Sequence, residues 1–219
     1  TEGGGDSAEV ALELMPGNKI RKYDTWHAMG QGATTGSLVV TLEALKEMHL
    51  TPEDIQLIQN DTKTCPDTGM AGASRSLYMD GNATIIAANK LLAAMRKEDG
   101  TLRTYDEMKA EGIETKYLGR YETNTTPGLC RLDPNTGIGD PTPAFTYCLN
   151  LAEVEVDTKT GKTTVLKFTC VDFVGRIGNI DAVNGQAYSG IMHGIGFALK
   201  EDYADVKKHA NMFGAGTSY

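Results

Sequence analysis

The sequence predicts an α+β fold, a mixed domain of antiparallel hairpins and helices that occupies residues 1–219 without an internal boundary. Three observations support this prediction. Short β-prone runs flank the turn signals Pro16-Gly17-Asn18 and Thr158-Lys159-Thr160-Gly161, as in hairpins. Between these hairpins, apolar residues recur every three or four positions, as in amphipathic helices. No repeat, low-complexity segment or clear linker divides the chain, which is long enough to bury a substantial core.

The first elements are a hairpin, a helix and a strand. Residues 10–14 and 19–24 form the predicted hairpin, and a glycine-rich loop follows it. Leucine and methionine then recur at helical steps over residues 34–49, which predicts an amphipathic helix. A turn at residues 51–54 precedes residues 55–59, Ile-Gln-Leu-Ile-Gln, which predict a strand. The order is therefore strand, glycine loop, helix and strand.

The middle of the chain is less regular. A polar loop over residues 60–76 leads into a second amphipathic helix that ends before Gly100. Residues 101–145 are rich in Gly, Pro, Thr and Asn, and their periodicity is weak. Within them we expect a short helix at residues 105–110 and a strand at residues 117–122.

The last part of the chain shows clear patterns again. Residues 146–174 alternate apolar and polar side chains on both sides of a turn and predict a long hairpin. A final helix is expected over residues 181–203. The first residue is not Met and the last residues are glycine-rich, so we interpret the sequence as a fragment of a larger protein.

Charge and composition exclude several classes of partner. The formal charge of −8 and the pI of about 5.0 argue against a nucleic-acid partner, which would require clustered Lys and Arg. No apolar run approaches the roughly 18 residues of a membrane span, so we expect no membrane association and a cytoplasmic location. The four cysteines are far apart and form no CxxC pair, which is typical of free thiols in a reducing compartment.

The first candidate binding loop is "WHAMGQGATTGS", with Gly30, Gln31 and Gly32 between a strand and a helix. A loop at this place exposes unpaired N–H groups and the positive end of the helix dipole, and both suit a phosphate. The loop lacks the Lys of a Walker motif and the spacing of the dinucleotide fingerprint. A plain turn and an anion-binding loop both remain open. His27 lies beside the loop and could bond a ligand there.

The second candidate loop contains Gly72, Ala73, Ser74, Arg75 and Ser76 at the start of the second helix. Its N–H groups and hydroxyls could hold phosphate oxygens, and Arg75 could bind one as a fork. A capping Ser with a solvated Arg is the alternative. Two such loops in one domain favour a single ligand with more than one polar or anionic part.

A third candidate region lies in "NGQAYSGIMHGIGFALKEDY", where glycines interrupt a helical pattern and Gln186 lies between small residues. Tight helix packing explains the small residues equally well. The four histidines are scattered without HxH or HExxH spacing, so we expect no metal ligand among the protein side chains. The carboxylates form no acid and base pair in the sequence, so no catalytic residue is assigned.

Three motifs, "MGQGATTG", "GMAGASRS" and "VDFVGRIGNIDAVNGQAYSGIMHGIGFALKEDY", occur in an order that resembles the molybdenum hydroxylases, the xanthine oxidase and aldehyde oxidoreductase family. The resemblance covers nearly the whole chain and is greatest to the aldehyde oxidoreductases of sulfate-reducing bacteria. It implies that the chain is a fragment of a larger molybdopterin-binding region.

The resemblance also implies which residues contact the cofactor. Gly30, Gln31 and Gly32 would lie near its metal end, with His27 at a phosphate. Gly72, Ala73, Ser74, Arg75 and Ser76 would hold the phosphate or pterin part, and Gln186 would bond the pterin from the last helix. The cofactor would be molybdopterin with Mo, in its cytosine dinucleotide form.

The chemistry implied for the parent protein is the oxidation of aldehydes to carboxylic acids with water as the oxygen source. A catalytic glutamate in a later motif and iron–sulfur clusters in other domains or in a partner subunit would complete the enzyme, which is expected to be a homo-oligomer. Neither the glutamate motif nor the cluster cysteines occur in this sequence, so we expect the isolated fragment to be inactive.

Two alternatives to the aldehyde enzyme remain. Within the family, the fragment could belong to a xanthine, nicotinate or carbon monoxide dehydrogenase, since the residues that select the substrate lie mostly elsewhere. Outside catalysis, it could be a nucleotide-binding or scaffold domain that has the glycine loops without the redox chemistry. Molybdenum analysis of the full-length protein distinguishes a molybdenum enzyme from a scaffold domain.

Overall fold

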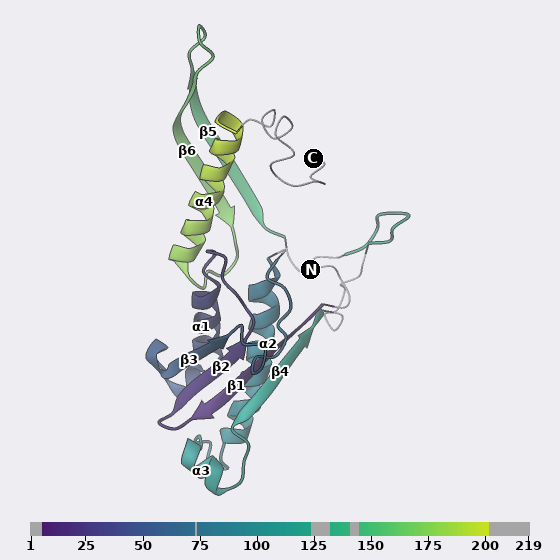
Figure 1. The fold of residues 1–219 in the computed structure, drawn as a ribbon, viewed down its shortest axis with the longest axis vertical. Coiled ribbons are helices and arrows are strands. Elements are labelled where there is room, and N and C mark those ends of the chain that lie inside the picture. Colours follow the sequence, from purple (N-terminus) through teal and green to yellow (C-terminus); the bar gives the residue numbers. More distant parts are fainter. Residues whose placement is uncertain (1–5, 73, 124–131, 141–144, 202–219) are drawn as a thin grey trace. The chain divides into compact units, whose positions relative to one another are not determined.

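A computed structural model describes residues 6–72, 74–123, 132–140 and 145–201 (Figure 1). The chain forms two compact units, Thr1–Phe145 and Thr146–Tyr219, and the structure defines each unit separately. The expectation of one undivided cofactor-binding part stays a prediction. None of the helices in the described residues combines the length and apolar character needed to cross a membrane.

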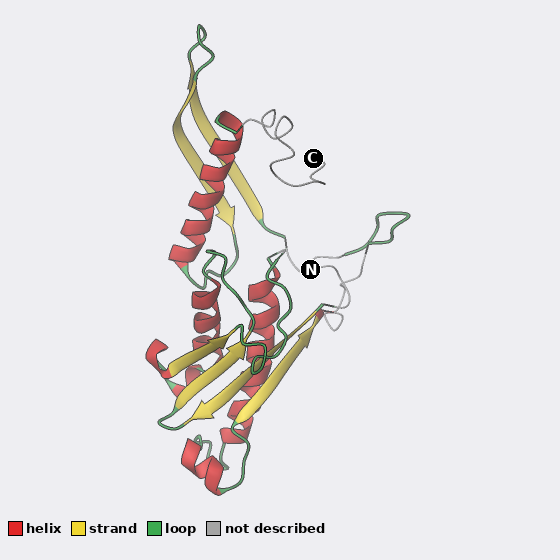
Figure 2. Ribbon diagram, viewed as in Figure 1, coloured by secondary structure: helices red, strands yellow, loops and turns green. Residues whose placement is uncertain are grey.

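The first unit is built on a four-stranded sheet in the order β3-β2-β1-β4 (Figure 2). The central strand β1, Ser7–Met15, is antiparallel to β2, Lys19–Asp24, and to β4, Lys116–Glu122. The edge strand β3, Ile55–Gln59, is parallel to β2. A helix, α1, Ala33–Ala44, connects these two parallel strands. The sequence predicted all of these elements, but not the parallel pairing.

Two helices, α1 and α2, pack together and cover one face of the sheet (Figure 1). The second of these, α2, spans Arg75–Met95, and the short helix α3 spans Tyr105–Ala110. Alternate residues of β1 point toward the helices, which explains its period-two pattern. The two clusters of fully or largely buried apolar side chains between sheet and helices contain Ala8, Val10, Leu12, Leu14, Ile20, Leu45, Met48, Ile55, Met79, Ala83, Ala87, Ala88, Leu91, Leu92, Met95 and Met108.

Two predicted helices differ from the observed ones at their ends. The last helix, expected over residues 181–203, spans Ile180–Leu199, and residues 202–203 lie outside the described residues. The helix expected over residues 34–49 is α-helical only to Ala44, and a 3₁₀ turn, Lys46–Met48, follows it. A second 3₁₀ turn, Pro52–Asp54, leads into β3. The short helix α3 begins and ends at the predicted residues. Thr104 caps it, because its side chain accepts a bond from the Glu107 N–H and its N–H donates to the Glu107 side chain.

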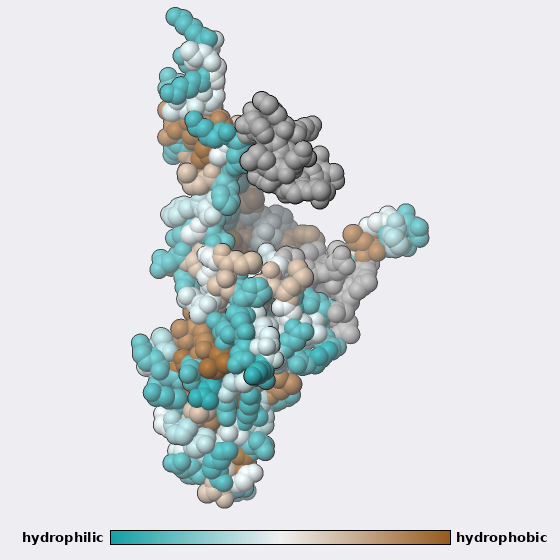
Figure 3. All heavy atoms as spheres, in the orientation of Figure 1, coloured by the Kyte–Doolittle hydropathy of each residue, from teal (hydrophilic) through white to brown (hydrophobic). Residues whose placement is uncertain are grey.

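The second unit consists of a long hairpin and one helix. Strands β5, Tyr147–Val156, and β6, Thr163–Phe173, are antiparallel and carry a bulge between Glu153 and Val154. Helix α4, Ile180–Leu199, follows them. Many apolar side chains of this unit are exposed, and Figure 3 shows several of them on the surface of the hairpin. The predicted α+β fold with antiparallel hairpins is confirmed.

Candidate functional site

The two candidate loops of the first unit follow adjacent parallel strands. β2 ends at Asp24 and β3 at Gln59, and each strand is followed by a loop that opens a helix, α1 or α2. Because parallel strands place their carboxyl ends at one edge of a sheet, both loops begin at the same edge. In open sheets with parallel strands, ligands bind beyond these carboxyl ends.

The bases of the two loops are joined by a pair of threonines. The Thr25 N–H donates to Thr68 Oγ1 at 2.8 Å, and the Thr68 N–H donates to Thr25 Oγ1 at 3.0 Å. Thr68, which is 3% exposed, also donates from its hydroxyl to the Glu9 carbonyl at 3.2 Å. The structure therefore brings together the first and second predicted loops. The sequence analysis missed both threonines, since nothing in their spacing indicates a pair 43 residues apart.

The helices that open from these loops lack the caps found elsewhere in the chain. The N-cap residues are Gly32 for α1 and Ser74 for α2, and in the part of the chain that the structure describes neither side chain bonds its helix. Neither first turn contains an acidic residue. By contrast, Thr104 and Asn179 cap α3 and α4, whose first turns are acidic. Among the described residues, the Arg75 N–H at the start of α2 donates to the Gly72 carbonyl at 3.0 Å. The other first-turn N–H groups of α1 and α2 have no side-chain cap, and the positive dipole ends of both helices could meet an anion.

Left-handed backbone shapes both loop ends. Gly32 has a φ of 83°, a conformation in which a Cβ would cost about 1–2 kcal/mol. Ser74 has a φ of 56° and adopts this conformation despite its side chain. Single residues in such conformations occur at turns and at ligand-binding sites. Ser74 is exposed, whereas Gly72 and Ser76 are half-buried; Ala73 lies outside the described residues.

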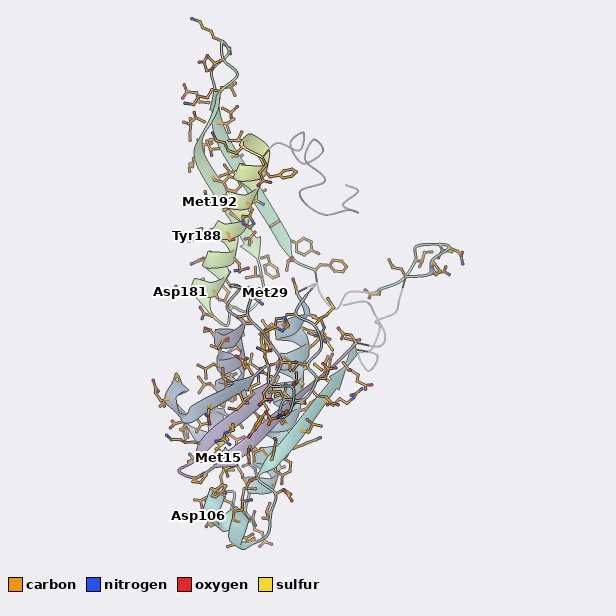
Figure 4. All side chains as sticks on the ribbon, viewed as in Figure 1. Met15, Met29, Asp106, Asp181, Tyr188 and Met192 are labelled. Carbon is orange, nitrogen blue, oxygen red and sulfur yellow. The ribbon has the colours of Figure 1, made fainter. Side chains whose placement is uncertain are left out.

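The first loop is closed by its own glutamine. The Met29 N–H donates to Gln31 Oε1 at 2.5 Å, and Gln31 Nε2 donates to the His27 carbonyl at 3.3 Å. His27 is exposed, and its Nδ1 lies 3.1 Å from the Thr25 carbonyl. Met29, labelled in Figure 4, is 69% exposed. The amide of Gln31 therefore fixes the backbone around Gly30.

Arg75 has a different environment from the one that the sequence suggested. Its guanidinium is 4% exposed and makes five hydrogen bonds, with both oxygens of Asp6 and with the carbonyls of Ser7, Thr68 and Met70. An arginine has five N–H donors, so all of them are used within the protein. Arg75 therefore has no donor left for the expected fork with a phosphate, and the alternative of a solvated arginine beside a capping Ser does not hold either.

A buried carboxylate, Asp24, anchors the start of the first loop. It accepts bonds from the Trp26 N–H at 3.3 Å, from Ser37 Oγ at 2.6 Å and from Gln59 Nε2 at 2.8 Å. These donors belong to the loop, to α1 and to the end of β3. Because Asp24 is completely buried, its bonds link these three segments in a place that water does not reach.

A buried lysine and a second aspartate extend this cluster. Lys22 Nζ lies 3.2 Å from Asp24 Oδ2 and 2.7 Å from Asp80 Oδ1, and all three side chains are fully buried. Among the described residues, Asp80 Oδ2 has no hydrogen-bond partner. Burial raises the pKa of Asp80 to about 6, since Lys22 only partly offsets the desolvation and Asp24 adds repulsion. No sequence pattern indicates this cluster, because charged residues at these positions are typical of solvated faces.

Gln186 belongs to the second unit, where it is exposed on α4. It lines a groove of about 470 Å³ between α4 and the hairpin, together with Asn150, Cys170, Asp172 and Gly190. The Cys170 thiol donates to Asp172 Oδ2 at 3.2 Å, and this bond raises the pKa of Cys170. The expectation that Gln186 shares a ligand with the loops of the first unit stays a prediction.

Comparisons with known proteins agree on one family. A family model described as a molybdopterin cofactor-binding domain matches residues 1–217. The aldehyde oxidoreductase of Megalodesulfovibrio gigas is 40% identical over 213 residues, which are 97% of this chain and 23% of that protein. The crystal structure of the aldehyde oxidoreductase from Desulfovibrio desulfuricans has a TM-score of 0.87 and 42% identity, over 99% of this chain and 23% of its own.

A more distant relative is the carbon monoxide dehydrogenase large chain of Hydrogenophaga pseudoflava. It is 27% identical over 215 residues, which are 89% of this chain and 26% of that protein. The chain thus spans about a quarter of the length of each of these relatives.

Proposed function

Because this chain belongs to the family of molybdopterin cofactor-binding domains of the molybdenum hydroxylases, we propose that the two loops of its first unit, residues 27–32 and 69–76, hold the anionic part of the cofactor. The observation that carries this proposal is the pair of uncapped helix starts at the ends of adjacent parallel strands. The family supports the identity of the ligand, and the geometry of the helix starts supports the proposed position.

The chemistry of the loops fits a phosphate-bearing cofactor. The N–H groups in the first turns of α1 and α2 are donors without side-chain caps, and no carboxylate in these turns would repel an anion. Exposed hydroxyls of Thr34, Thr35 and Ser74 lie at the same helix starts and can donate further bonds. We propose the cytosine dinucleotide form of the cofactor, whose second phosphate would use the second loop.

Within the parent protein, this cofactor would supply a molybdenum centre that takes up two electrons as an aldehyde is oxidised to a carboxylic acid with oxygen from water. The residues of this chain bind and orient: Gln31 fixes the first loop through its own backbone bonds. We assign no acid or base to this chain. The catalytic glutamate and the iron–sulfur clusters would belong to other parts of the parent, which we propose to be a homo-oligomer.

Metal and nucleotide analysis of the purified full-length protein tests the proposal. We expect molybdenum and a pterin, and release of a cytidine nucleotide on acid treatment. Gln31→Ala is expected to lower molybdenum content, because the loop loses the amide that closes it. Gln56→Ala is the matched control, since Gln56 is an exposed glutamine on β3 whose amide oxygen accepts a bond from Arg21 Nε. Equal molybdenum content in both variants contradicts the assignment of Gln31.

Two alternatives have defined signatures. If the full-length protein oxidises carbon monoxide, xanthine or nicotinate instead of aldehydes, the parent belongs to another branch of the family. The 27% identity to a carbon monoxide dehydrogenase large chain supports this alternative. The 40% identity to an aldehyde oxidoreductase favours aldehydes. A full-length protein without molybdenum or pterin would instead support the scaffold alternative.

A further inference from the structure

We propose that Asp6 and Arg75 are positioning residues, which hold the second loop in its binding conformation without touching the cofactor. This inference rests on the proposed function of that loop. It differs from the simplest interpretation of an arginine at a glycine-rich helix start, in which the guanidinium would bind a phosphate directly.

The first argument is the set of bonds around the guanidinium. Nε and one Nη of Arg75 donate to the two oxygens of Asp6, both at 2.7 Å, in the bidentate arrangement of a strong ion pair. The remaining donors reach the carbonyls of Ser7 at 3.0 Å, Thr68 at 2.9 Å and Met70 at 2.7 Å. One side chain therefore ties the start of β1, the second loop and the start of α2 together.

The second argument is independent and concerns Gly69. This residue has a φ of 76°, and a Cβ built on it would lie 2.8 Å from both terminal nitrogens of Arg75. The loop backbone thus lies directly against the guanidinium, in a conformation that favours glycine. The guanidinium of Arg75 therefore limits the path that the backbone can take between Thr68 and Met70.

Burial explains why the pair must act as a unit. The Arg75 side chain is 5% exposed and that of Asp6 is 26% exposed. Removing the carboxylate would leave a buried, uncompensated positive charge, which is far more costly than the loss of a surface ion pair. Lysine cannot replace the arginine, because its three donors cannot satisfy five acceptors in one plane.

The experiment uses the full-length protein with Asp6→Asn and Arg75→Lys. Matched controls are Glu111→Gln and Arg103→Lys, because Arg103 also bonds one carboxylate, Glu111, at 2.8 Å, and the carbonyls of Ala94 and Arg96. These control residues lie near the other end of α2. Molybdenum and pterin content, melting temperature and amide hydrogen exchange of residues 66–72 are measured for each variant.

We expect Asp6→Asn and Arg75→Lys to lower cofactor content by a similar factor. Loss of a residue that orients a binding group typically weakens binding about tenfold or more. Both variants are also expected to accelerate exchange in residues 66–72. The control variants are expected to keep wild-type cofactor content even where their melting temperatures fall. Asp6→Glu retains the charge and is expected to lose less cofactor than Asp6→Asn.

Three results would overturn the proposal. If Arg75→Lys loses cofactor while Asp6→Asn keeps or gains it, the arginine binds the ligand directly and Asp6 merely competes for it. If all variants lose cofactor in proportion to melting temperature, the pair acts on global stability alone. If Asp6→Asn does not fold, Arg75→Lys is the deciding variant, and wild-type cofactor content in folded Arg75→Lys overturns the proposal. A wild-type protein without molybdenum or pterin would instead refute the proposed function itself.

Discussion

Replacement of Asp80 by Asn is expected to change the pH dependence of stability. Asp80 is buried beside Lys22, and Asp24 lies on the other side of that lysine. Burial raises the pKa of Asp80 from 3.8 to about 6 in the folded protein. The folded state therefore binds a proton at this carboxyl more tightly than the unfolded state does.

The size and sign of the effect follow from this difference. At about 1.4 kcal/mol per pH unit, the interval between 3.8 and about 6 corresponds to about 3 kcal/mol. This contribution to the free energy of unfolding is fully present below pH 3.8 and is lost as the pH rises through about 6. Asparagine does not titrate, so wild type should gain about 2 kcal/mol of this contribution relative to Asp80→Asn between about pH 7 and pH 4.

Urea unfolding from pH 4 to pH 7, followed by tryptophan fluorescence, measures the difference. The chain has a single tryptophan, Trp26, which is 5% exposed and whose ring centre lies 5.7 Å from Lys22 Nζ. Comparison of the two proteins at each pH removes the contribution of other carboxyls, such as Glu107, whose pKa is lowered to about 2 chiefly by its bond with Lys97. Asp106→Asn, an exposed aspartate of α3 labelled in Figure 4, is the control for loss of one charge. A difference between wild type and Asp80→Asn that is constant with pH would refute the reasoning.

Two further substitutions test the supports of the loops. Ser37→Ala removes the 2.6 Å bond to Asp24 and leaves a buried carboxylate oxygen with one donor fewer. We therefore expect the free energy of unfolding, measured in urea, to fall by about 1–3 kcal/mol. A fall of less than about 0.5 kcal/mol would show that the bond is dispensable. Thr68→Val keeps the side-chain shape but removes the hydroxyl that joins the two loops through Thr25, so we expect a stability loss of about 1 kcal/mol in the chain and lower molybdenum content in the full-length protein. Unchanged molybdenum content in Thr68→Val would indicate that the two loops need not be joined.

Local signals in the sequence predicted the elements well. The helix at Tyr105–Ala110 has a Thr cap and a Glu three residues later, and the hairpins have clear turns and period-two alternation. These features depend on residues within a few positions of one another. The parallel pairing of β2 and β3 depends instead on the crossover through α1, which no local pattern specifies.

The roles of individual site residues were harder to predict than the loops themselves. The sequence indicated an arginine at a helix start, but its partner Asp6 is 69 residues away. Asp80 lies inside a helix pattern, where a charged residue usually marks the solvated face. Both cases have one physical cause: burial and long-range pairing give a charged side chain a role that the local sequence does not indicate.

The same long-range bonds explain how the loops can be ready for an anion. The side chains around them are satisfied internally: Gln31 bonds its own loop, Asp24 receives donors from three segments, and Arg75 is saturated by Asp6 and carbonyls. In the described part of the chain the first turns of α1 and α2 lack side-chain caps, and of their N–H groups that of Arg75 donates to the Gly72 carbonyl. A loop fixed in this way loses little conformational entropy on binding, and preorganisation of this kind increases affinity. The uncapped helix starts are therefore a local cost in stability, and under the proposed function they would form the surface that meets the cofactor.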